Sequence, residues 1–366
     1  MSGVYIHIPF CDSKCDYCDF LSFANQQNAW VGYKSSVINE LARFEPKEKI
    51  DTIYIGGGTP TIWHADFLAE LLQACPAPMN NAEITCEANP GTLTSAKIAT
   101  LKAGGVNRIS LGLQAWQPRL LKALNRRATH EDFTENFNAL RQVGFNNINV
   151  DIMFAIPGQT VQEWEETLQK VVDLQPEHIS AYACTLEEKT PLWDRVQSAA
   201  IKQLDDETDR RMYHYAKLFL HENGYSQYEL SNFCKPGMES RHNTKYWTRQ
   251  PYRGFGLGAH SFENNARWHN TLDLQQYIKW DVQERFELAK ISNAEAMSET
   301  IFLGLRLTKG LLESNFAKVF GCYPSEVYGD WIRQMKSEEM LATQDGYMFL
   351  TDLGMDFANK VMRGFM

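Results

Sequence analysis

The chain has 366 residues and a mass of 42.0 kDa, enough for one large domain with one or two small ones. Its net charge of -9 argues against nucleic acid as the main partner, because backbone phosphates require clustered Lys and Arg. The eight cysteines occur without a visible export signal and without any apolar run of about 20 residues, so we expect a cytoplasmic protein with reduced thiols and no transmembrane segment.

The first predicted strand, residues 4–7, leads directly into three closely spaced cysteines, Cys11, Cys15 and Cys18. One loop can therefore bring three thiolates to a single metal centre. Structural zinc prefers four protein ligands, usually as two pairs, and the next cysteine, Cys75, has no CxxC partner. Iron–sulfur clusters are also held by cysteine thiolates, normally four. Three thiolates predict a cluster with one iron left open for another ligand.

Short β-rich runs then alternate with helical patterns through residues 1–205, which predicts a parallel sheet. Six such units are too few for a closed eight-fold barrel, so we predict an α/β fold built on a three-quarter, TIM-like βα barrel. The expected strands are 4–7, 52–55, 83–87, 108–112, 147–154 and 178–183, and the expected helices are 30–43, 65–74, 95–103, 117–124, 130–143 and 161–174.

Polar and glycine residues gather where these predicted strands end. A Gly-Gly-Gly-Thr-Pro loop follows the second strand, Glu87 ends the third, Gln114 follows the fourth, and Asp151 lies within the fifth. In barrels of this kind the carboxyl ends of the strands form the active site. These residues are therefore expected to meet the cysteine loop at one site.

Two further segments are predicted after the barrel. Residues 206–290 read as a helix (206–223), a strand (226–230) and a loop rich in Asn, Gly, His and aromatic residues (231–270). Residues 291–366 read as three helices (294–305, 311–320, 324–338), a short strand at 348–350 and a last helix (351–363), resembling a small winged helix. This segment has seven basic and ten acidic residues, which favours packing or partner binding over DNA binding.

The cysteine spacing C-x3-C-x2-C, with Tyr17 before the last cysteine, resembles the signature of the radical S-adenosylmethionine (SAM) superfamily. The resemblance implies that the three cysteines hold a [4Fe–4S] cluster whose open iron binds the amino and carboxylate groups of SAM. It also implies that the loop containing Gly57, Gly58 and Thr59 receives the SAM amino group. A tight barrel turn is the structural alternative for that loop.

Further motifs resemble the oxygen-independent coproporphyrinogen dehydrogenase family along the whole chain: Gly-Gly-Gly-Thr-Pro, Glu-Ala-Asn-Pro, Arg-Ile-Ser-Leu-Gly-Leu-Gln and Asp-Ile-Met-Phe-Ala-Ile-Pro-Gly-Gln-Thr. The family pattern implies that Glu87 binds the ribose hydroxyls of SAM. It places additional SAM contacts at Tyr5, Gln114, Arg126 and Asp151. Arg126 as a surface salt bridge and Asp151 as a buried hydrogen-bonding group are the structural alternatives.

At two points the chain departs from the dehydrogenase pattern and resembles the haem chaperones of this family instead. Phe20 stands where the dehydrogenases carry another cysteine, and only ten residues precede Cys11. The resemblance implies a protein that binds haem and passes it to haem-requiring respiratory membrane enzymes, peripherally at the membrane and as a possible homodimer. The alternative is oxidative decarboxylation of coproporphyrinogen III by a SAM-derived radical. A third function, radical modification of RNA, fits poorly with the net negative charge of the chain.

His242 opens an HNxxYW sequence that is associated with haem binding in the haem-chaperone group. Neutral imidazole is a good axial ligand for haem iron, so His242 is the leading haem-ligand candidate. The structural alternative is a histidine that stabilises the surrounding aromatic packing.

Overall fold

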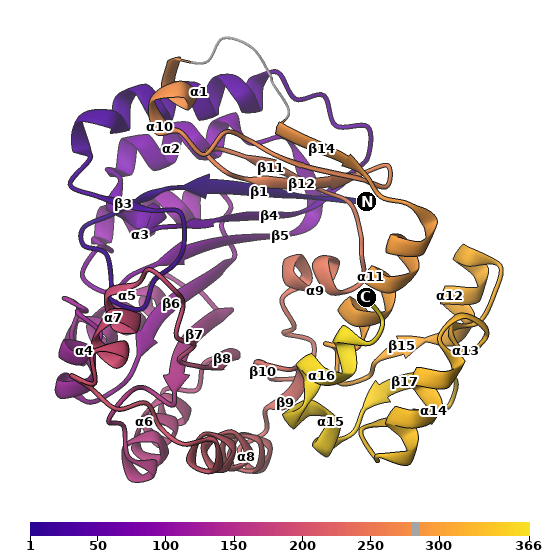
Figure 1. Ribbon diagram of the computed structural model, residues 1–366. Coiled ribbons are helices and arrows are strands. Elements are labelled where there is room, and N and C mark those ends of the chain that lie inside the picture. Colours follow the sequence, from indigo (N-terminus) through magenta and orange to yellow (C-terminus); the bar gives the residue numbers. More distant parts are fainter. Residues whose placement is uncertain (280–285) are drawn as a thin grey trace.

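The computed structural model describes residues 1–279 and 286–366. Its main feature is a curved sheet whose central strands are the six predicted ones, all parallel and in chain order. Figure 1 shows this sheet curving into an open barrel, with helices packed outside it. The predicted α/β partial barrel is confirmed. The six strands are β1 (Ser2–Ile8), β4 (Ile50–Gly57), β5 (Pro78–Ala88), β6 (Arg108–Gln114), β7 (Ile148–Phe154) and β8 (His178–Ala183).

The helices of the barrel begin close to where the sequence places them. Thr129 caps α5 by accepting a hydrogen bond from the Asp132 backbone N–H, and the Asp132 carboxylate accepts one from the Thr129 backbone N–H, which completes a capping box. The helices are α1 (Trp30–Ala42), α2 (Ala65–Ala74), α3 (Ser95–Ala103), α4 (Pro118–Ala123), α5 (His130–Gln142), α6 (Val161–Asp173), α7 (Pro191–Gln197) and α8 (Asp206–Glu222), with short 3-10 turns at Gln27–Ala29 and Pro60–Ile62.

The prediction of a loop over 231–270 is wrong, because much of this segment joins the sheet. Strand β11 extends the parallel sheet beyond β1, β12 to β14 continue it in antiparallel fashion, and β10 and β9 extend the opposite edge. Gly254 lets β11 and β12 approach closely, since a Cβ there would lie 2.2 Å from the His260 carbonyl oxygen. The elements are β9 (Ser226–Glu229), β10 (Asn232–Cys234), α9 (Arg241–Trp247), β11 (Tyr252–Phe255), β12 (His260–Glu263), β13 (Ala266–His269), α10 (Leu274–Lys279) and β14 (Phe286–Lys290).

Helix α9, which carries the HNxxYW sequence, packs against β4 and against α11 of the C-terminal unit. Residues 280–285 of the predicted 206–290 extension lie outside the described residues. A separate minor strand pair, β2 (Phe10–Cys11) with β3 (Phe23–Ala24), brackets the cysteine loop.

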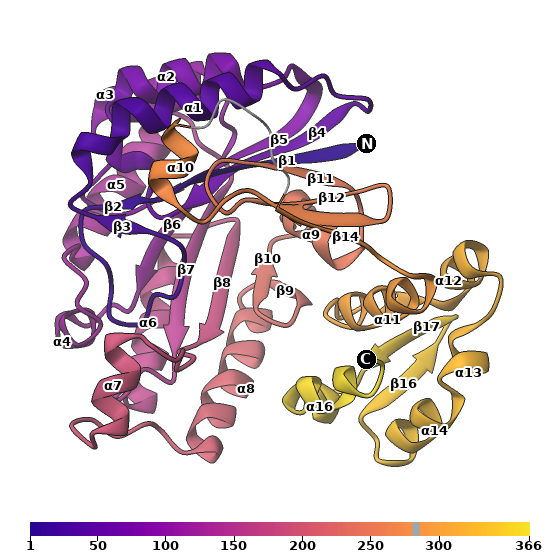
Figure 2. The same ribbon diagram turned by 45° about the horizontal axis from the view of Figure 1, so that its top comes forward.

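The C-terminal unit has its own apolar core and lies beside α9 and the β9–β10 edge (Figure 2). Its order of helices followed by a hairpin is as predicted, but two predicted helices are broken, at Tyr328 and at Phe357, where the backbone leaves helical values. The elements are α11 (Asn293–Gly304), β15 (Leu311–Leu312), α12 (Glu313–Phe320), α13 (Pro324–Val327), α14 (Gly329–Ser337), β16 (Leu341–Gln344), β17 (Tyr347–Leu350), α15 (Asp352–Asp356) and α16 (Ala358–Arg363).

Candidate functional site

A pocket of about 360 Å³ lies at the carboxyl ends of the parallel strands, between them and the cysteine loop. It gathers every residue predicted for the cluster and SAM site except Tyr5, although these residues come from six separate parts of the barrel. The predicted residues that line it are Cys11, Cys15, Tyr17, Cys18, Gly57, Gly58, Thr59, Glu87, Gln114, Arg126 and Asp151.

The cysteine loop is held over the glycine-rich loop by backbone hydrogen bonds. The Gly58 N–H donates to the Ile8 carbonyl at 2.9 Å, and the Thr59 N–H donates to the Phe10 carbonyl at 2.8 Å. A Cβ at Gly58 would lie 2.7 Å from the Phe10 carbonyl oxygen and 3.0 Å from Cys11 Sγ. Only glycine permits this approach, which sets the height of Cys11 above the strands.

The three cysteines of the loop reach one pocket. Cys11, Cys15 and Cys18 all line it, and all three are free thiols. Cysteine thiolates are the ligands of iron–sulfur clusters, so this donor set fits such a cluster.

Glu87 is fixed at the end of β5 by two donors. The Tyr54 hydroxyl donates to Oε1 at 2.7 Å, and the Gly57 N–H donates to Oε2 at 3.1 Å. Burial raises the pKa of this carboxyl to about 7, an effect that the two hydrogen bonds partly offset. Gly57 adopts a φ of +115°, and a Cβ at Gly56 would lie 2.9 Å from the carboxylate. A carboxylate held in this way can accept hydrogen bonds from vicinal hydroxyls.

Arg126 lies inside the pocket, so the surface salt-bridge alternative is wrong. Its guanidinium donates to the Gly112 carbonyl at 2.5 Å and to Asn89 Oδ1 at 3.0 Å. It also lies 3.5 Å from the Tyr17 hydroxyl and 4.0 Å from Cys15 Sγ. The arginine therefore connects the cysteine loop to the ends of β5 and β6, and it supplies positive charge beside the thiols.

Asp151 is a hydrogen-bonded, partly buried carboxylate that also lines the pocket. Ser110 Oγ donates to it at 2.9 Å, and Asn149 Nδ2 donates to it at 2.8 Å. Gln114, one strand away, accepts a hydrogen bond from the Tyr182 hydroxyl at 2.8 Å. The φ of Gln114 is +71°, an unfavourable conformation for a residue with a side chain, and such strain often accompanies functional sites.

The pocket lining also includes polar residues that the sequence did not single out, among them Tyr54, Asn89, Ser110 and Tyr182. Tyr54 and Ser110 share the concave side of the sheet with Glu87 and Gln114. Their two-residue alternation with the predicted site residues is a signal in the sequence that could have found them.

Tyr5 and His242 do not line the pocket. The Tyr5 hydroxyl bonds His7 Nδ1 at 2.8 Å, and the Tyr5 ring lies 6.2 Å from the ring of Tyr54. Burial, with a lesser contribution from Glu87, raises the pKa of Tyr5 well above its usual value. Tyr5 thus supports the strands below the pocket, and its direct contact with SAM stays a prediction.

His242 is only 1% exposed, and both of its ring nitrogens are occupied. Nδ1 lies 2.9 Å from Thr52 Oγ1, and Nε2 lies 2.8 Å from the Tyr246 hydroxyl. The ring stacks on Tyr54 with a centroid distance of 5.2 Å. Burial and the nearby Lys245 ammonium lower the pKa of His242 to about 3, which keeps the imidazole neutral. Iron ligation by His242 would require these bonds to open, and it stays a prediction.

The aromatic residues that follow His242 in the sequence are dispersed. Tyr252 packs edge-on against Tyr246 at 4.7 Å, whereas Phe255 packs on the other side of the strand against Phe44 at 5.1 Å. The Trp247 ring lies under the Arg306 guanidinium at 4.2 Å, at the contact with the C-terminal unit. In this arrangement the HNxxYW helix joins the barrel to that unit.

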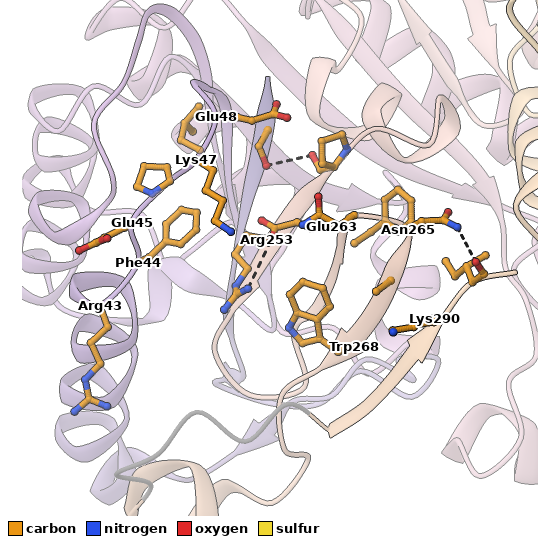
Figure 3. A pocket seen from close by; sticks show the side chains of 18 residues that line it. Arg43, Phe44, Glu45, Lys47, Glu48, Arg253, Glu263, Asn265, Trp268 and Lys290 are labelled. Atoms are coloured by element: carbon orange, nitrogen blue, oxygen red, sulfur yellow. Dashed lines mark hydrogen bonds and ion pairs between the residues drawn. The ribbon is translucent and has the colours of Figure 1, made fainter. Parts of the chain in front are cut away.

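A larger hollow of about 840 Å³ opens at the opposite ends of the strands, beside Phe44, Arg253 and Trp268 (Figure 3). It contains none of the predicted site residues. The Trp268 ring is nearly buried, with the Arg253 guanidinium 5.0 Å from its centre. The smaller pocket, where thiols, carboxylates and an arginine converge, is therefore the better candidate for chemistry.

Comparisons with known proteins agree with this site. The family model of the radical SAM superfamily matches residues 5–171, and that of the HemN C-terminal domain matches residues 291–357. The heme chaperone HemW of Lactococcus lactis is 34% identical over 100% of this chain and 97% of its own length. The heme chaperone HemW of Bacillus subtilis is 32% identical over 100% of this chain and 99% of its own length.

Among solved structures, coproporphyrinogen III oxidase (HemN) from Escherichia coli has a TM-score of 0.86. The match covers 99% of this chain and 89% of that one at 19% sequence identity, so it shows a shared fold. Within residues 1–279 and 286–366, no helix combines the length and apolar character that crossing a bilayer requires. The chain belongs to the radical SAM superfamily and, within it, to the coproporphyrinogen dehydrogenase-like family that includes the heme chaperones named HemW.

Proposed function

We propose that this protein is a haem chaperone that binds haem and delivers it to haem-requiring respiratory enzymes. The observation that carries the proposal is similarity over the full chain to two proteins named heme chaperone HemW. Phe20 supports it: this side chain is 65% exposed and stands at the pocket, where the dehydrogenases have another cysteine.

The proposed resident groups are a [4Fe–4S] cluster on Cys11, Cys15 and Cys18, and SAM beside it. Radical SAM membership implies both groups. The cluster supplies an open iron and one-electron chemistry when it is bound. The Gly57–Thr59 loop offers backbone groups to the SAM amino end, and Glu87 offers a carboxylate to the ribose. The proposed SAM site is completed by Gln114, Arg126, Asp151 and Tyr17, and Tyr5 supports the strands below it.

Haem is the proposed cargo, with His242 as the leading candidate ligand. The helix that carries His242 lies at the contact between barrel and C-terminal unit, where a change of packing can expose it. Delivery is proposed to occur in the cytoplasm, at the membrane surface, to membrane-bound acceptors. A homodimer is proposed as a possible assembly for this transfer.

The second candidate function is oxidation of coproporphyrinogen III by radical chemistry. The fold shared with HemN favours it, and so does the convergence in one pocket of every predicted cluster and SAM residue except Tyr5. Under the chaperone proposal the same pocket regulates haem transfer or assembly without turning over porphyrinogen.

One experiment separates the two functions. The protein is reconstituted anaerobically with iron and sulfide, then assayed with coproporphyrinogen III, SAM and a reductant. We expect no protoporphyrinogen, while haemin added to the same preparation gives a shifted Soret band. Formation of protoporphyrinogen at a rate typical of enzymes would instead support the oxidase function. A matched variant with Cys11, Cys15 and Cys18 changed to alanine should lose the cluster absorbance, whereas Cys75→Ala should keep it.

A further inference from the structure

A relay of hydrogen bonds crosses the barrel interior from the start of α9 to the SAM pocket. The Ser240 backbone N–H donates to the Tyr228 hydroxyl at 3.2 Å, and that hydroxyl lies 2.8 Å from His178 Nε2. His178 Nδ1 lies 2.6 Å from Oδ1 of Asn149, and Nδ2 of Asn149 donates to Oδ1 of Asp151 at 2.8 Å. The relay therefore ends on a carboxylate that lines the pocket.

The direction of the hydrogen bonds at the pocket end of the relay follows from the carboxylate. A carboxylate accepts hydrogen bonds and does not donate them, so the Asn149 amide turns its N–H groups toward Asp151 and toward Ser110 Oγ, 2.7 Å away. The Asn149 carbonyl oxygen then faces His178, and it also accepts from Ser180 Oγ at 3.1 Å. His178 must donate to this oxygen, so its proton lies on Nδ1.

The rest of the relay follows from a neutral His178. This histidine is fully buried, and burial, with a contribution from the Arg108 charge, lowers the pKa of His178 well below its usual value. Its Nε2 therefore carries no proton and accepts one from the Tyr228 hydroxyl, which stays protonated because burial raises the pKa of Tyr228. The Tyr228 oxygen accepts in turn from the Ser240 N–H. Every donor points from α9 toward Asp151.

Ser240 determines where α9 begins. Its side chain accepts from the Asn243 N–H at 3.3 Å and its carbonyl accepts from the Thr244 N–H at 3.0 Å, which makes it the N-cap residue. His242 lies in the first turn of this helix and is 1% exposed. Haem can therefore reach His242 only if this turn moves, and such a movement draws the Ser240 N–H away from Tyr228.

We propose that the relay couples the two sites, so that SAM in the pocket and haem at α9 oppose each other's binding. The coupling rests on the proposed function, and it assigns to SAM the role of promoting haem release. SAM that contacts Asp151 stabilises the orientation of Asn149 and, through His178, the packed position of α9. Haem requires α9 to move, which takes from His178 its Tyr228 partner and lets the Asn149 amide turn away from Asp151.

His178 is a positioning residue in this arrangement, because it acts on SAM through Asn149 and Asp151. Coupling between two binding sites is reciprocal. SAM should therefore lower haem affinity by the same factor by which haem lowers SAM affinity.

The first test measures haemin affinity of the full chain, with its cluster reconstituted anaerobically, in the absence and presence of saturating SAM. We expect the wild type to bind haemin roughly fivefold to tenfold more weakly with SAM, a typical size for coupling between sites. SAM affinity, measured by calorimetry without and with saturating haemin, should fall by the same factor. A haemin affinity that SAM leaves unchanged or increases overturns the proposal.

Tyr228→Phe keeps the aromatic ring and removes the hydroxyl that joins Ser240 to His178. The ratio of haemin affinities without and with SAM should fall to about twofold or less, even if either affinity alone also changes. A purely structural role of Tyr228 would leave this ratio at its wild-type value, and that result overturns the relay. Tyr225→Phe is the control, because it removes a buried hydroxyl bonded to the Pro176 carbonyl at 2.7 Å and should keep the wild-type ratio.

Two changes at His178 test the pocket end of the relay through SAM affinity alone. His178→Leu removes the donor to Asn149, whereas the amide of His178→Asn can place an N–H group near the position of Nδ1. SAM should bind His178→Asn roughly threefold or more tightly than His178→Leu. If His178→Leu does not fold, the Tyr228→Phe ratio decides the proposal.

These results separate the coupling from the chaperone function. A wild type that binds SAM but no haemin contradicts the chaperone function, and the two His178 variants then decide the relay: equal SAM affinities overturn it. A wild type that binds haemin with an affinity independent of SAM supports the chaperone function and overturns the coupling.

Discussion

The Tyr54 hydroxyl lies 2.7 Å from Oε1 of Glu87, which lines the proposed SAM pocket. The same Tyr54 ring stacks on His242 at 5.2 Å. One side chain thus contacts both the proposed ribose-binding carboxylate and the proposed haem ligand. Changes at either residue can reach the other through a single aromatic ring.

Changing Tyr54 to Phe should weaken SAM binding. The Tyr54 hydroxyl lowers the pKa of Glu87, which burial raises to about 7. Without this donor the carboxyl keeps its proton to higher pH and accepts fewer hydrogen bonds. We expect a loss of roughly tenfold in SAM affinity at pH 7, because hydrogen bonds to charged groups contribute about 1.5–3 kcal/mol. Calorimetry on the cluster-loaded protein measures it.

The pH profile distinguishes this cause from a general loss of packing. SAM affinity of Tyr54→Phe relative to wild type should recover as pH rises above 7, because Glu87 then ionises in both proteins. Tyr225→Phe is the matched control, since it removes a buried tyrosine hydroxyl bonded to the Pro176 carbonyl at 2.7 Å, far from the pocket. An affinity ratio that does not change with pH would contradict the argument.

Gly58→Ala should impair cluster assembly without unfolding the barrel. The new Cβ would lie 2.7 Å from the Phe10 carbonyl oxygen and 3.0 Å from Cys11 Sγ, so the cysteine loop must move away. We expect the yield of reconstituted cluster, measured by iron content and absorbance, to fall several-fold. Gly329→Ala, where the new Cβ meets only the flexible end of Arg333, should reconstitute normally. Equal cluster yields in both variants would show that cluster assembly does not depend on the position of the cysteine loop above the strands.

The sequence was sufficient to predict that most of the candidate cluster and SAM residues meet in one pocket, because they lie at recognisable places in a repeating βα pattern. Cys11, Glu87 and Gln114 all come directly at or after a strand end, and parallel strands bring such ends to one edge. Local pattern and tertiary position coincide here. The same reasoning could not separate Arg126 inside the pocket from Arg126 on the surface, since that depends on how the chain turns after α4.

The rest of the site depends on contacts between residues far apart in the chain. His242 bonds Thr52 across 190 residues, and no periodicity relates the two. Strand β11 pairs with β1 although about 250 residues separate the paired positions, and its four residues are too few for a strand pattern among glycines. Short elements and buried polar pairs escape prediction for this reason.

Buried histidines should make the fold sensitive to acid. The pKa of His242 is lowered to about 3 in the folded protein and returns to about 6.5 on unfolding. Its contribution to stability is therefore complete above pH 6.5 and is lost as pH falls toward 3, by about 1.4 kcal/mol per pH unit. His242→Gln should reduce the fall in stability between pH 7 and pH 5, measured by urea unfolding. His221→Gln, on the last turn of α8, is the control and should leave the fall unchanged.

Arg306 should hold the C-terminal unit against the barrel. Its guanidinium lies over the Trp247 ring at 4.2 Å and 3.8 Å from Oε2 of Glu229, a carboxylate whose pKa is raised by burial. Arg306→Met leaves this carboxylate without its cation, so we expect a loss of about 1–3 kcal/mol in unfolding free energy at pH 7.5. A carboxyl with a raised pKa destabilises the fold as pH rises, so the loss should be smaller at pH 5 than at pH 7.5, because protonation of Glu229 removes the charge that Arg306 balances. Arg333→Met, which removes an exposed arginine paired with Asp330, should change stability by less than about 0.5 kcal/mol. A loss in Arg306→Met that is the same at both pH values would mean that stacking on Trp247, and not the charge of Glu229, makes this contact.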